Sequence, residues 1–206
     1  MLRFVSPTEA EFVLKDYLAT GELPSLTEQK VTVLFADIAD STRMAEALGA
    51  KRFANILNNF YQEASEIVFR HRGLIKYLGD GVWGIFTERD GETSSENKAV
   101  QAGRELIHQI NRTGSLDTNR RLVFGVSINT GNAMVGYIGT KDRVEFNALG
   151  DVVNVAYRMQ EYARPYKIIT GPATIAAIAD KCRFNRIGAL NLRGRENTIQ
   201  VYEVLS

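Results

Sequence analysis

The strongest constraint on the fold comes from two apolar stretches, each of which carries a single aspartate where a predicted strand ends. Residues 31–36 (Val-Thr-Val-Leu-Phe-Ala) are too apolar and too short to be anything but a buried strand, and Asp37 follows directly. Residues 74–86 form two apolar runs around an Asp80-Gly81 step, which is a strong signal for a β-hairpin. If these strands are neighbours in one sheet, the two carboxylates meet at one edge.

Two carboxylates without a nearby His or Cys favour a hard cation that prefers oxygen ligands, such as Mg²⁺ or Mn²⁺, and these ions suit phosphoryl chemistry. The alternative is structural, because an aspartate after a strand often caps a helix or forms a turn. Asp40, Ser41 and Thr42 already offer caps for the helix that follows, so Asp37 is not needed for that task. Together the two motifs favour a metal site.

Composition is that of one globular domain. The chain has 206 residues, of which 45% are hydrophobic and 24% charged, and its net charge of +1 gives no reason to expect nucleic acid as a partner. Cys182 is the only cysteine, which excludes an intrachain disulfide and fits a reducing compartment. His71 and His108 lack metal-ligand spacing, so a zinc site is not expected.

No apolar run approaches the length of a membrane span, and Glu9 and Glu11 interrupt the start of the chain where a secretory segment would be apolar. We therefore expect a cytoplasmic domain that makes no membrane contact itself. It can still belong to a longer membrane-bound or multidomain parent, fused to regulatory domains.

The sequence pattern predicts strands and helices that follow one another along the chain. Residues 1–27, with an amphipathic helix at 8–18, are assigned to an N-terminal lead-in or linker, and residues 28–206 to one domain. The expected elements of that domain are a strand at 31–36, a long helix ending at Gly73, the hairpin 74–86, a helix ending near Thr113, strands at 122–128 and 133–138, a helix at 151–162, a strand at 166–170, a helix from Pro172 and short strands at 198–205. This order predicts an α+β fold of the ferredoxin-like (palm-like) kind, an antiparallel sheet flanked by helices.

The segment 131–139 is rich in glycine, but it joins two predicted strands and opens no helix. A dinucleotide-binding fingerprint requires a strand, a turn and a helix in that order. We therefore interpret residues 129–132 as the turn of a hairpin.

Three further polar residues lie where a ligand could use them. Asn154 and Arg158 are four residues apart on the predicted helix, so both project from one face and suit a ribose and a phosphate. Lys76 stands in an otherwise apolar strand, where its amine needs a partner. In isolation, Arg158 fits a solvated arginine on a surface helix better than a ligand-binding residue.

The motifs FADI (residues 35–38), KxxGDG (76–81) and GDxVNxAxR (150–158) occur in the order in which the class III nucleotidyl cyclase catalytic domain carries them. The chain resembles that family from about Glu28 to its C-terminus, including the closing segment 192–204. The resemblance implies the cyclase fold, a sheet of the palm-like kind.

The resemblance also implies roles for the matched residues. Asp37 and Asp80 match the family's two metal-binding aspartates, which with the backbone carbonyl of Ile38 would hold two Mg²⁺ or Mn²⁺ ions. Asn154 matches the asparagine that orients the ribose, and Arg158 matches the arginine that stabilises the pentavalent phosphorus.

Four more residues are implied in substrate binding. Lys76 matches the purine-selecting lysine of adenylyl cyclases, and Arg195, with Arg193 as the neighbouring choice, matches a basic residue that touches the triphosphate. Asn147 departs from the usual Asp or Thr at the second purine-selecting position, and its amide can pair with adenine or guanine. Lys76 argues for ATP, since a cation donates to unprotonated adenine N1 and clashes with the protonated N1 of guanine.

The resemblance therefore implies an adenylyl cyclase that makes 3′,5′-cyclic AMP and pyrophosphate from ATP by two-metal, in-line attack at the α-phosphorus. In the family the aspartates come from one subunit, and the lysine, asparagine and arginine from the other. Because this chain holds both sets, a head-to-tail homodimer with two sites is expected. The alternatives are a guanylyl cyclase, raised by Asn147, and a non-catalytic dimerisation or nucleotide-sensing module with the same fold.

Overall fold

The computed structural model describes residues 18, 21–22, 25–88, 93–113, 115–117, 120–140, 144–191 and 197–205. Its elements in chain order are β1 (Thr27–Ile38), α2 (Ser41–Leu48), α3 (Ala50–Arg70), β2 (Leu74–Leu78), β3 (Gly81–Thr87), α4 (Ser95–Thr113), β4 (Ser115–Asp117), β5 (Arg120–Arg121), β6 (Phe124–Gly139), β7 (Val144–Leu149), α5 (Asp151–Met159), the 3₁₀ helix η1 (Gln160–Tyr162), β8 (Ile168–Thr170), α6 (Pro172–Ile178), β9 (Phe184–Leu190) and β10 (Ile199–Val204). The expected helix at 8–18 lies outside the described residues apart from Leu18, and the boundary at residue 28 remains a prediction.

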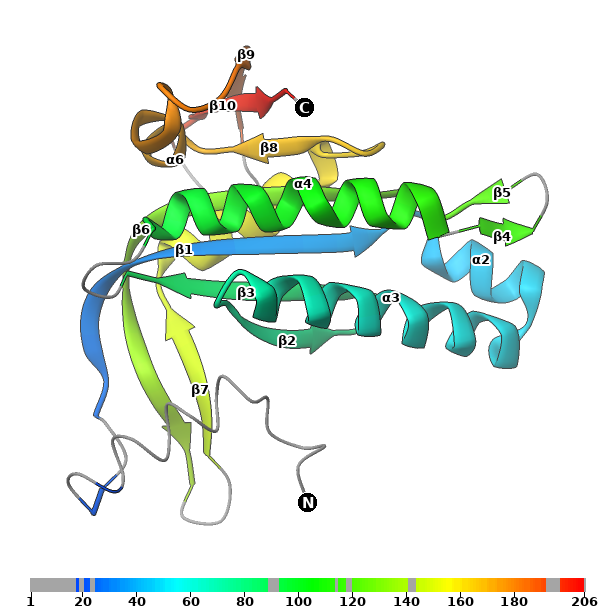
Figure 1. Cartoon of the computed structure of the whole chain (residues 1–206), viewed down its shortest axis with the longest axis horizontal. Helices are drawn as coiled ribbons and strands as arrows, with labels where there is room; N and C mark the ends of the chain where they lie inside the picture. The colour runs from blue at the N-terminus through cyan, green and yellow to red at the C-terminus, as the bar shows by residue number, and fades with distance from the viewer. Residues whose placement is uncertain are drawn as a thin grey trace.

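One sheet organises the molecule, with strand order β2-β3-β1-β6-β8-β10-β9 and β7 paired to β6. Its pairs are antiparallel except β6 with β8, which run parallel. Helices α3 and α4 pack side by side along the sheet (Figure 1). The predicted α+β fold, a largely antiparallel sheet flanked by helices, is confirmed.

Alternation along β1 divides the core between the two faces of the sheet. Leu34 and Ile38 pack with α3 and α4, whereas Val33 and Phe35 belong to a second cluster that includes side chains of α5. Burying an aliphatic side chain of this size stabilises the fold by about 2 kcal/mol. Because side chains alternate, Asp37 is on the same face of β1 as Phe35, the face covered by α5.

The prediction of a hairpin turn at 129–132 is wrong, because β6 runs unbroken through these residues. Their polar side chains are satisfied inside the sheet rather than in a turn. The Asn129 amide donates to the Val152 carbonyl at 3.1 Å, and the Thr130 hydroxyl lies 2.9 Å from that of Thr32 on β1. Pairing of β6 with β1 along the whole length of β1 keeps the glycine-rich segment extended.

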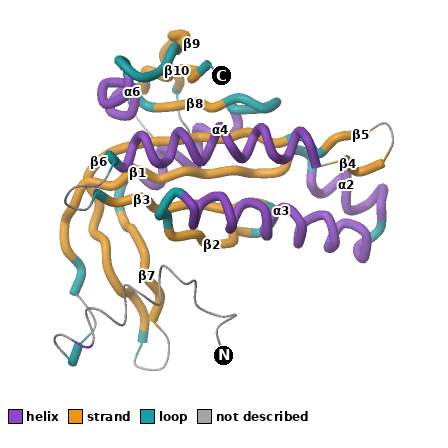
Figure 2. The backbone as a smooth tube through the Cα atoms, viewed as in Figure 1, coloured by secondary structure: helices purple, strands orange, loops and turns teal. Residues whose placement is uncertain are grey.

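Other elements also differ from expectation, among them the unpredicted strands β4, β5 and β9. The long helix predicted after the first strand is divided into α2 and α3. The break is at Gly49, whose φ of 80° is not helical. Strand β7 was not predicted; it pairs with the C-terminal half of β6, and together they extend away from the main helices (Figure 2).

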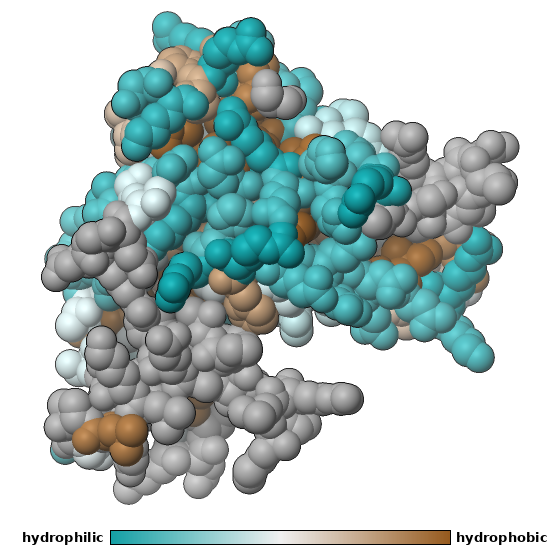
Figure 3. Space-filling model, viewed as in Figure 1, coloured by the Kyte–Doolittle hydropathy of each residue, from teal (hydrophilic) through white to brown (hydrophobic). Residues whose placement is uncertain are grey.

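The outer surface over α3 and α4 is mostly hydrophilic (Figure 3), as expected for amphipathic helices that pack one side on a sheet. Among the described helices, none combines the length and the apolar character that crossing a membrane requires.

Candidate functional site

Asp37 is the second-last residue of strand β1. It pairs with Gly81 of β3 on one side and with Gly125 of β6 on the other, so two glycines flank the aspartate in the sheet. A Cβ at position 81 would come within 2.9 Å of the Asp37 Oδ1 atom and 2.8 Å of the Ala36 carbonyl oxygen. The carboxylate therefore packs directly against the backbone of β3, and its side chain is only 15% exposed.

Asp80 reaches the same place from the tip of the β2–β3 hairpin. The tight turn consists of Gly79 and Asp80, closed by the pair Leu78 and Gly81, and Gly79 supplies the positive φ of 60°. The expected hairpin is confirmed, although its turn lies one residue earlier than the Asp-Gly step suggested. The Ile38 amide donates to the Asp80 carbonyl at 3.4 Å, which joins the turn to the end of β1.

Two tyrosines support this turn from α3 and β2. The Tyr61 hydroxyl donates to the Gly79 carbonyl, and the Tyr61 ring stacks on Tyr77 with centroids 4.3 Å apart. The Tyr77 hydroxyl in turn lies 2.8 Å from the Ser65 hydroxyl. The aromatic pair thus holds the loop that presents Asp80.

Burial and mutual repulsion raise the pKa of Asp37 from 3.8 to about 6. Loss of hydration on burial is the larger cause, and the neighbouring Asp80 carboxylate adds to it. Asp80 directly precedes Gly81, the β3 residue that pairs with Asp37, so the two aspartates lie at the same end of the sheet. A divalent cation would relieve this repulsion, and carboxylate oxygens are the ligands that Mg²⁺ and Mn²⁺ prefer.

The donor set available to such an ion is small. In the part of the chain that the structure describes, no group of three or more His, Cys, Asp or Glu side chains could hold a metal. Two carboxylates fit ions that keep several water or substrate oxygens, as Mg²⁺ does. The predicted third ligand, the Ile38 carbonyl, is a backbone atom next to Asp37 and remains a prediction.

Arg164 contacts this pair and was not predicted from the sequence. Its guanidinium donates to Oδ2 of Asp37 and opposes the rise in the pKa of that carboxyl. Arg164 lies in the turn between η1 and β8, far from Asp37 in the chain. No motif marks it, so only the parallel placement of β8 beside β6 reveals the contact.

These electrostatics predict how pH and Asp37 govern stability without metal. A carboxyl whose pKa is higher in the folded protein binds more protons there, so the free energy of unfolding falls as pH rises from about 4 to about 6, by up to about 3 kcal/mol. Asp37→Asn should flatten this slope and stabilise the protein at pH 8, with part of the gain offset because Arg164 loses its partner. Urea denaturation in EDTA at several pH values would measure it. Glu46→Gln on the exposed side of α2 is the control, and equal slopes for wild type and Asp37→Asn would contradict the prediction.

The two predicted purine-selecting residues lie on β2 and β7. Lys76 is only 20% exposed, and its ammonium lies 3.0 Å from the Glu145 carboxylate. Glu145 and Asn147 are two residues apart on β7 and therefore share one face. The structure thus brings Lys76 to the strand that carries Asn147 and supplies the partner that the strand lysine needs. Glu145 was missed, although the same alternation around Asn147 could have indicated it.

Asn154 and Arg158 are both on α5, as predicted, with Asn154 exposed and Arg158 partly exposed. Within the described part of the chain, no hydrogen bond or ion pair joins either side chain to Asp37 or Asp80. Helix α5 is anchored beside β1 by the edge-to-face contact of Tyr157 with Phe35, at a centroid distance of 5.6 Å. Arg193 and Arg195 lie outside the described residues.

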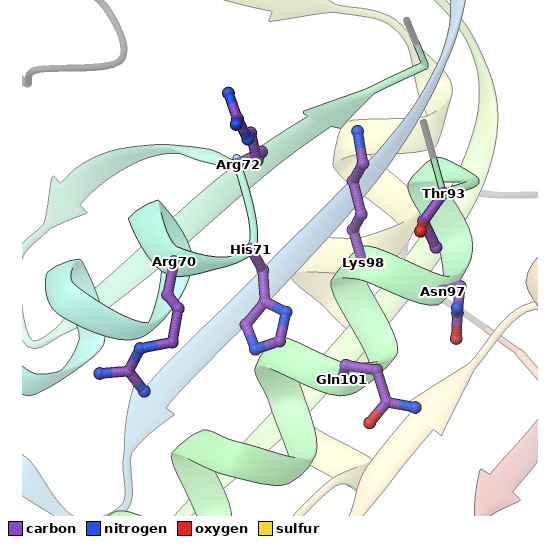
Figure 4. Close-up of a pocket in the computed structure, with 7 residues that line it drawn as sticks. All are labelled: Arg70, His71, Arg72, Thr93, Asn97, Lys98 and Gln101. Carbon is purple, nitrogen blue, oxygen red and sulfur yellow. The ribbon is translucent and has the colours of Figure 1, made fainter. Parts of the chain in front are cut away.

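A cavity of about 450 Å³ lies elsewhere, between the end of α3 and the start of α4 (Figure 4). Its basic lining residues are Arg70, His71, Arg72 and Lys98. Arg70 and His71 both contact Glu105 of α4. The cavity is at the end of β2 opposite the Asp80 turn, and none of the predicted site residues lines it.

Residues 23–205 match the family described as the adenylate and guanylate cyclase catalytic domain. Adenylate cyclase 1 of Rhizobium meliloti is 30% identical over 186 residues, which cover 86% of this chain and 28% of that protein. The terminal-differentiation-specific adenylate cyclase of Dictyostelium discoideum is 28% identical over 190 residues, covering 86% of this chain and 9% of that protein. The chain therefore spans less than a third of the length of either relative.

Solved structures give the same result for the fold. The adenylyl cyclase CyaB of P. aeruginosa superposes with a TM-score of 0.77 at 28% identity, covering 89% of this chain and 97% of that chain. The guanylyl cyclase Cya2 superposes with a TM-score of 0.81 over 88% of this chain and 94% of that chain, and at 24% identity it speaks for the fold alone.

Proposed function

Since the chain belongs to the class III family of adenylate and guanylate cyclase catalytic domains, we propose that it is an adenylyl cyclase that converts ATP into 3′,5′-cyclic AMP and pyrophosphate. The observation that carries the proposal is the convergence of Asp37 and Asp80 at one end of the sheet, where burial and repulsion favour a bound cation. A protein that used this fold only for dimerisation would have no need to place two repelling carboxylates side by side, one of them mostly buried.

The chain's own residues would divide the work in three. Asp37 and Asp80, with the Ile38 carbonyl, would hold two Mg²⁺ or Mn²⁺ ions, which when bound lower the pKa of the ribose 3′-hydroxyl and neutralise the triphosphate. Asn154 would orient the ribose through its amide. Arg158 would donate from its planar guanidinium to the oxygens of the pentavalent phosphorus. Arg195 or Arg193, which lie outside the described residues, would contact the triphosphate.

Lys76 supports ATP as the substrate. An ammonium has three donors, so Lys76 can keep one on Glu145 and direct another to adenine N1. Glu145 thereby fixes the position of the amine. The Asn147 side-chain oxygen, which accepts the Ala148 amide at 3.0 Å, is turned back to its own strand and would have to reorient to read a base.

A guanylyl cyclase is the second candidate, and one observation favours it. Glu145 and Asn147 both offer acceptor oxygens on the same face of β7, and guanine presents donors at N1 and N2. Turnover assays with ATP and with GTP, each under Mg²⁺ and under Mn²⁺, decide between the two. Efficient use of GTP with poor use of ATP would overturn the proposed substrate.

Base selection gives a second test. Lys76→Glu should lower kcat/KM for ATP by about a hundredfold or more, because the site would face adenine N1 with an acceptor. Adding Asn147→Cys should admit GTP. Lys51→Glu, on the exposed surface of α3, is the matched control for the change of charge. An unchanged ATP-to-GTP preference in the double variant would show that these positions do not select the base.

The proposed active form is a head-to-tail homodimer. Met134 and Leu149 form a cross-strand pair on β6 and β7, and they are 40% and 52% exposed. Tyr157 on α5 is 48% exposed and is close in sequence to both Asn154 and Arg158. An exposed apolar surface beside the ribose- and phosphate-binding residues suits a second copy of the chain. Because the relatives are much longer, we further propose a cytoplasmic domain fused to regulatory domains.

A further inference from the structure

We infer that Arg164 is a positioning residue of the metal site. Its guanidinium holds the Asp37 carboxylate in the metal-free protein and must leave Oδ2 before a divalent ion can bind there. The inference rests on the proposed function, because it takes Asp37 as a metal ligand. Beyond the proposed function, the inference states that the metal ion displaces Arg164, a residue of the same chain, from Asp37.

The fold delivers Arg164 to this position through a close backbone contact. Gly125, the neighbour of Asp37 on β6, leaves room for the chain that precedes Arg164: a Cβ at position 125 would lie 2.4 Å from the Ala163 carbonyl oxygen. Two backbone hydrogen bonds tie the residues that follow Arg164 to β6, from the Tyr166 amide to the Phe124 carbonyl at 2.8 Å and from the Val126 amide to the Lys167 carbonyl at 2.9 Å. Arg164 therefore reaches Asp37 from a backbone that is tied to β6.

Competition with a metal follows from the chemistry of the two partners. The guanidinium and a divalent ion both seek Oδ2 of Asp37, and two cations cannot approach one oxygen without repelling each other. Arginine does not lose its proton in proteins, so the contact is broken by displacement and not by titration. The neighbouring Asp80 remains available throughout.

Arg164 is also held in a way that permits exchange. Its side chain is 31% exposed, whereas that of Asp37 is 15% exposed. Its buried Nε atom has no hydrogen-bond partner among the described residues, and its contact with the Asp37 carboxylate is made through Nη2. A guanidinium with one anionic partner and an exposed edge can turn away when an ion takes that partner.

The test measures Mn²⁺ binding to the nucleotide-free chain at pH 8, by electron paramagnetic resonance of free Mn²⁺. Arg164→Gln should bind Mn²⁺ about fivefold or more tightly than wild type, because the competing cation is gone. Arg186→Gln, on the exposed strand β9, should match wild type. Affinity equal to or weaker than wild type in Arg164→Gln would overturn the inference.

Asp37→Asn separates this inference from the function on which it rests. Loss of Mn²⁺ binding in Asp37→Asn together with unchanged binding in Arg164→Gln would overturn the inference alone. Unchanged binding in Asp37→Asn would overturn the metal site itself, and the inference with it.

A second measurement follows the wild-type protein itself and uses a variant only to assign the signal. In wild type, the Nε–H resonance of Arg164, assigned through its absence in Arg164→Lys, should shift during a Mg²⁺ titration with the midpoint of metal binding. A resonance that stays unchanged while Mg²⁺ saturates the site would overturn displacement.

Discussion

Replacing Asp37 or Asp80 with alanine is expected to abolish cyclase activity while the domain stays folded. Each change removes one of the two carboxylates that converge beside the end of β1. Losing the metal clamp should cost on the order of 4 kcal/mol of transition-state stabilisation, which is about a thousandfold in turnover. Initial rates of cyclic nucleotide and pyrophosphate formation under saturating Mn²⁺ measure this loss, since excess metal compensates for a merely weakened site.

Folding is the necessary control for both variants. Neither carboxylate packs in the apolar core, and the electrostatic cost of Asp37 disappears with its charge, so the melting temperature without metal should not fall markedly. Glu46→Ala on the exposed side of α2 is the matched control and should keep wild-type turnover. Near-normal turnover in a folded Asp37→Ala or Asp80→Ala protein would remove the metal site from the proposed mechanism.

The sequence was sufficient for those features that depend on local patterns. The hairpin around Asp80 follows from turn residues between two apolar runs, and α5 follows from helical periodicity with Asn154 and Arg158 on it. The continuous β6 did not follow, because Asn129 and Thr130 favour turns locally and are kept extended by partners elsewhere in the fold, such as Thr32 on β1.

The same holds for the site: local sequence patterns indicated some of its residues, and contacts between distant residues were missed. The convergence of Asp37 and Asp80 needs only that two predicted strands be neighbours. The contacts of Arg164 with Asp37 and of Glu145 with Lys76 join residues 127 and 69 positions apart, and they depend on strand order and on β7, which the pattern did not reveal. A resemblance to a family assigns roles only to residues that match one of its motifs. Neither Arg164 nor Glu145 was assigned a role in this way.

The matched residues lie on two different parts of the fold. Asp37 and Asp80 lie together, whereas Asn154 and Arg158 sit on α5 without a hydrogen bond or ion pair to them among the described residues. The proposed head-to-tail dimer would bring the two sets to one nucleotide from two different chains. Each dimer would then have two equivalent sites.

Mixing two inactive variants tests this arrangement. Asp37→Ala homodimers and Arg158→Ala homodimers should both be inactive, because every site lacks one residue. A heterodimer of the two variants collects both changes in one site and leaves the other intact. With equal amounts and random exchange, about half the dimers are mixed and each has one working site, so activity should return to about a quarter of wild type. Both variants must first be verified as folded and dimeric. If the co-refolded mixture stays as inactive as either variant alone, each site lies within a single chain and the shared-site dimer is wrong.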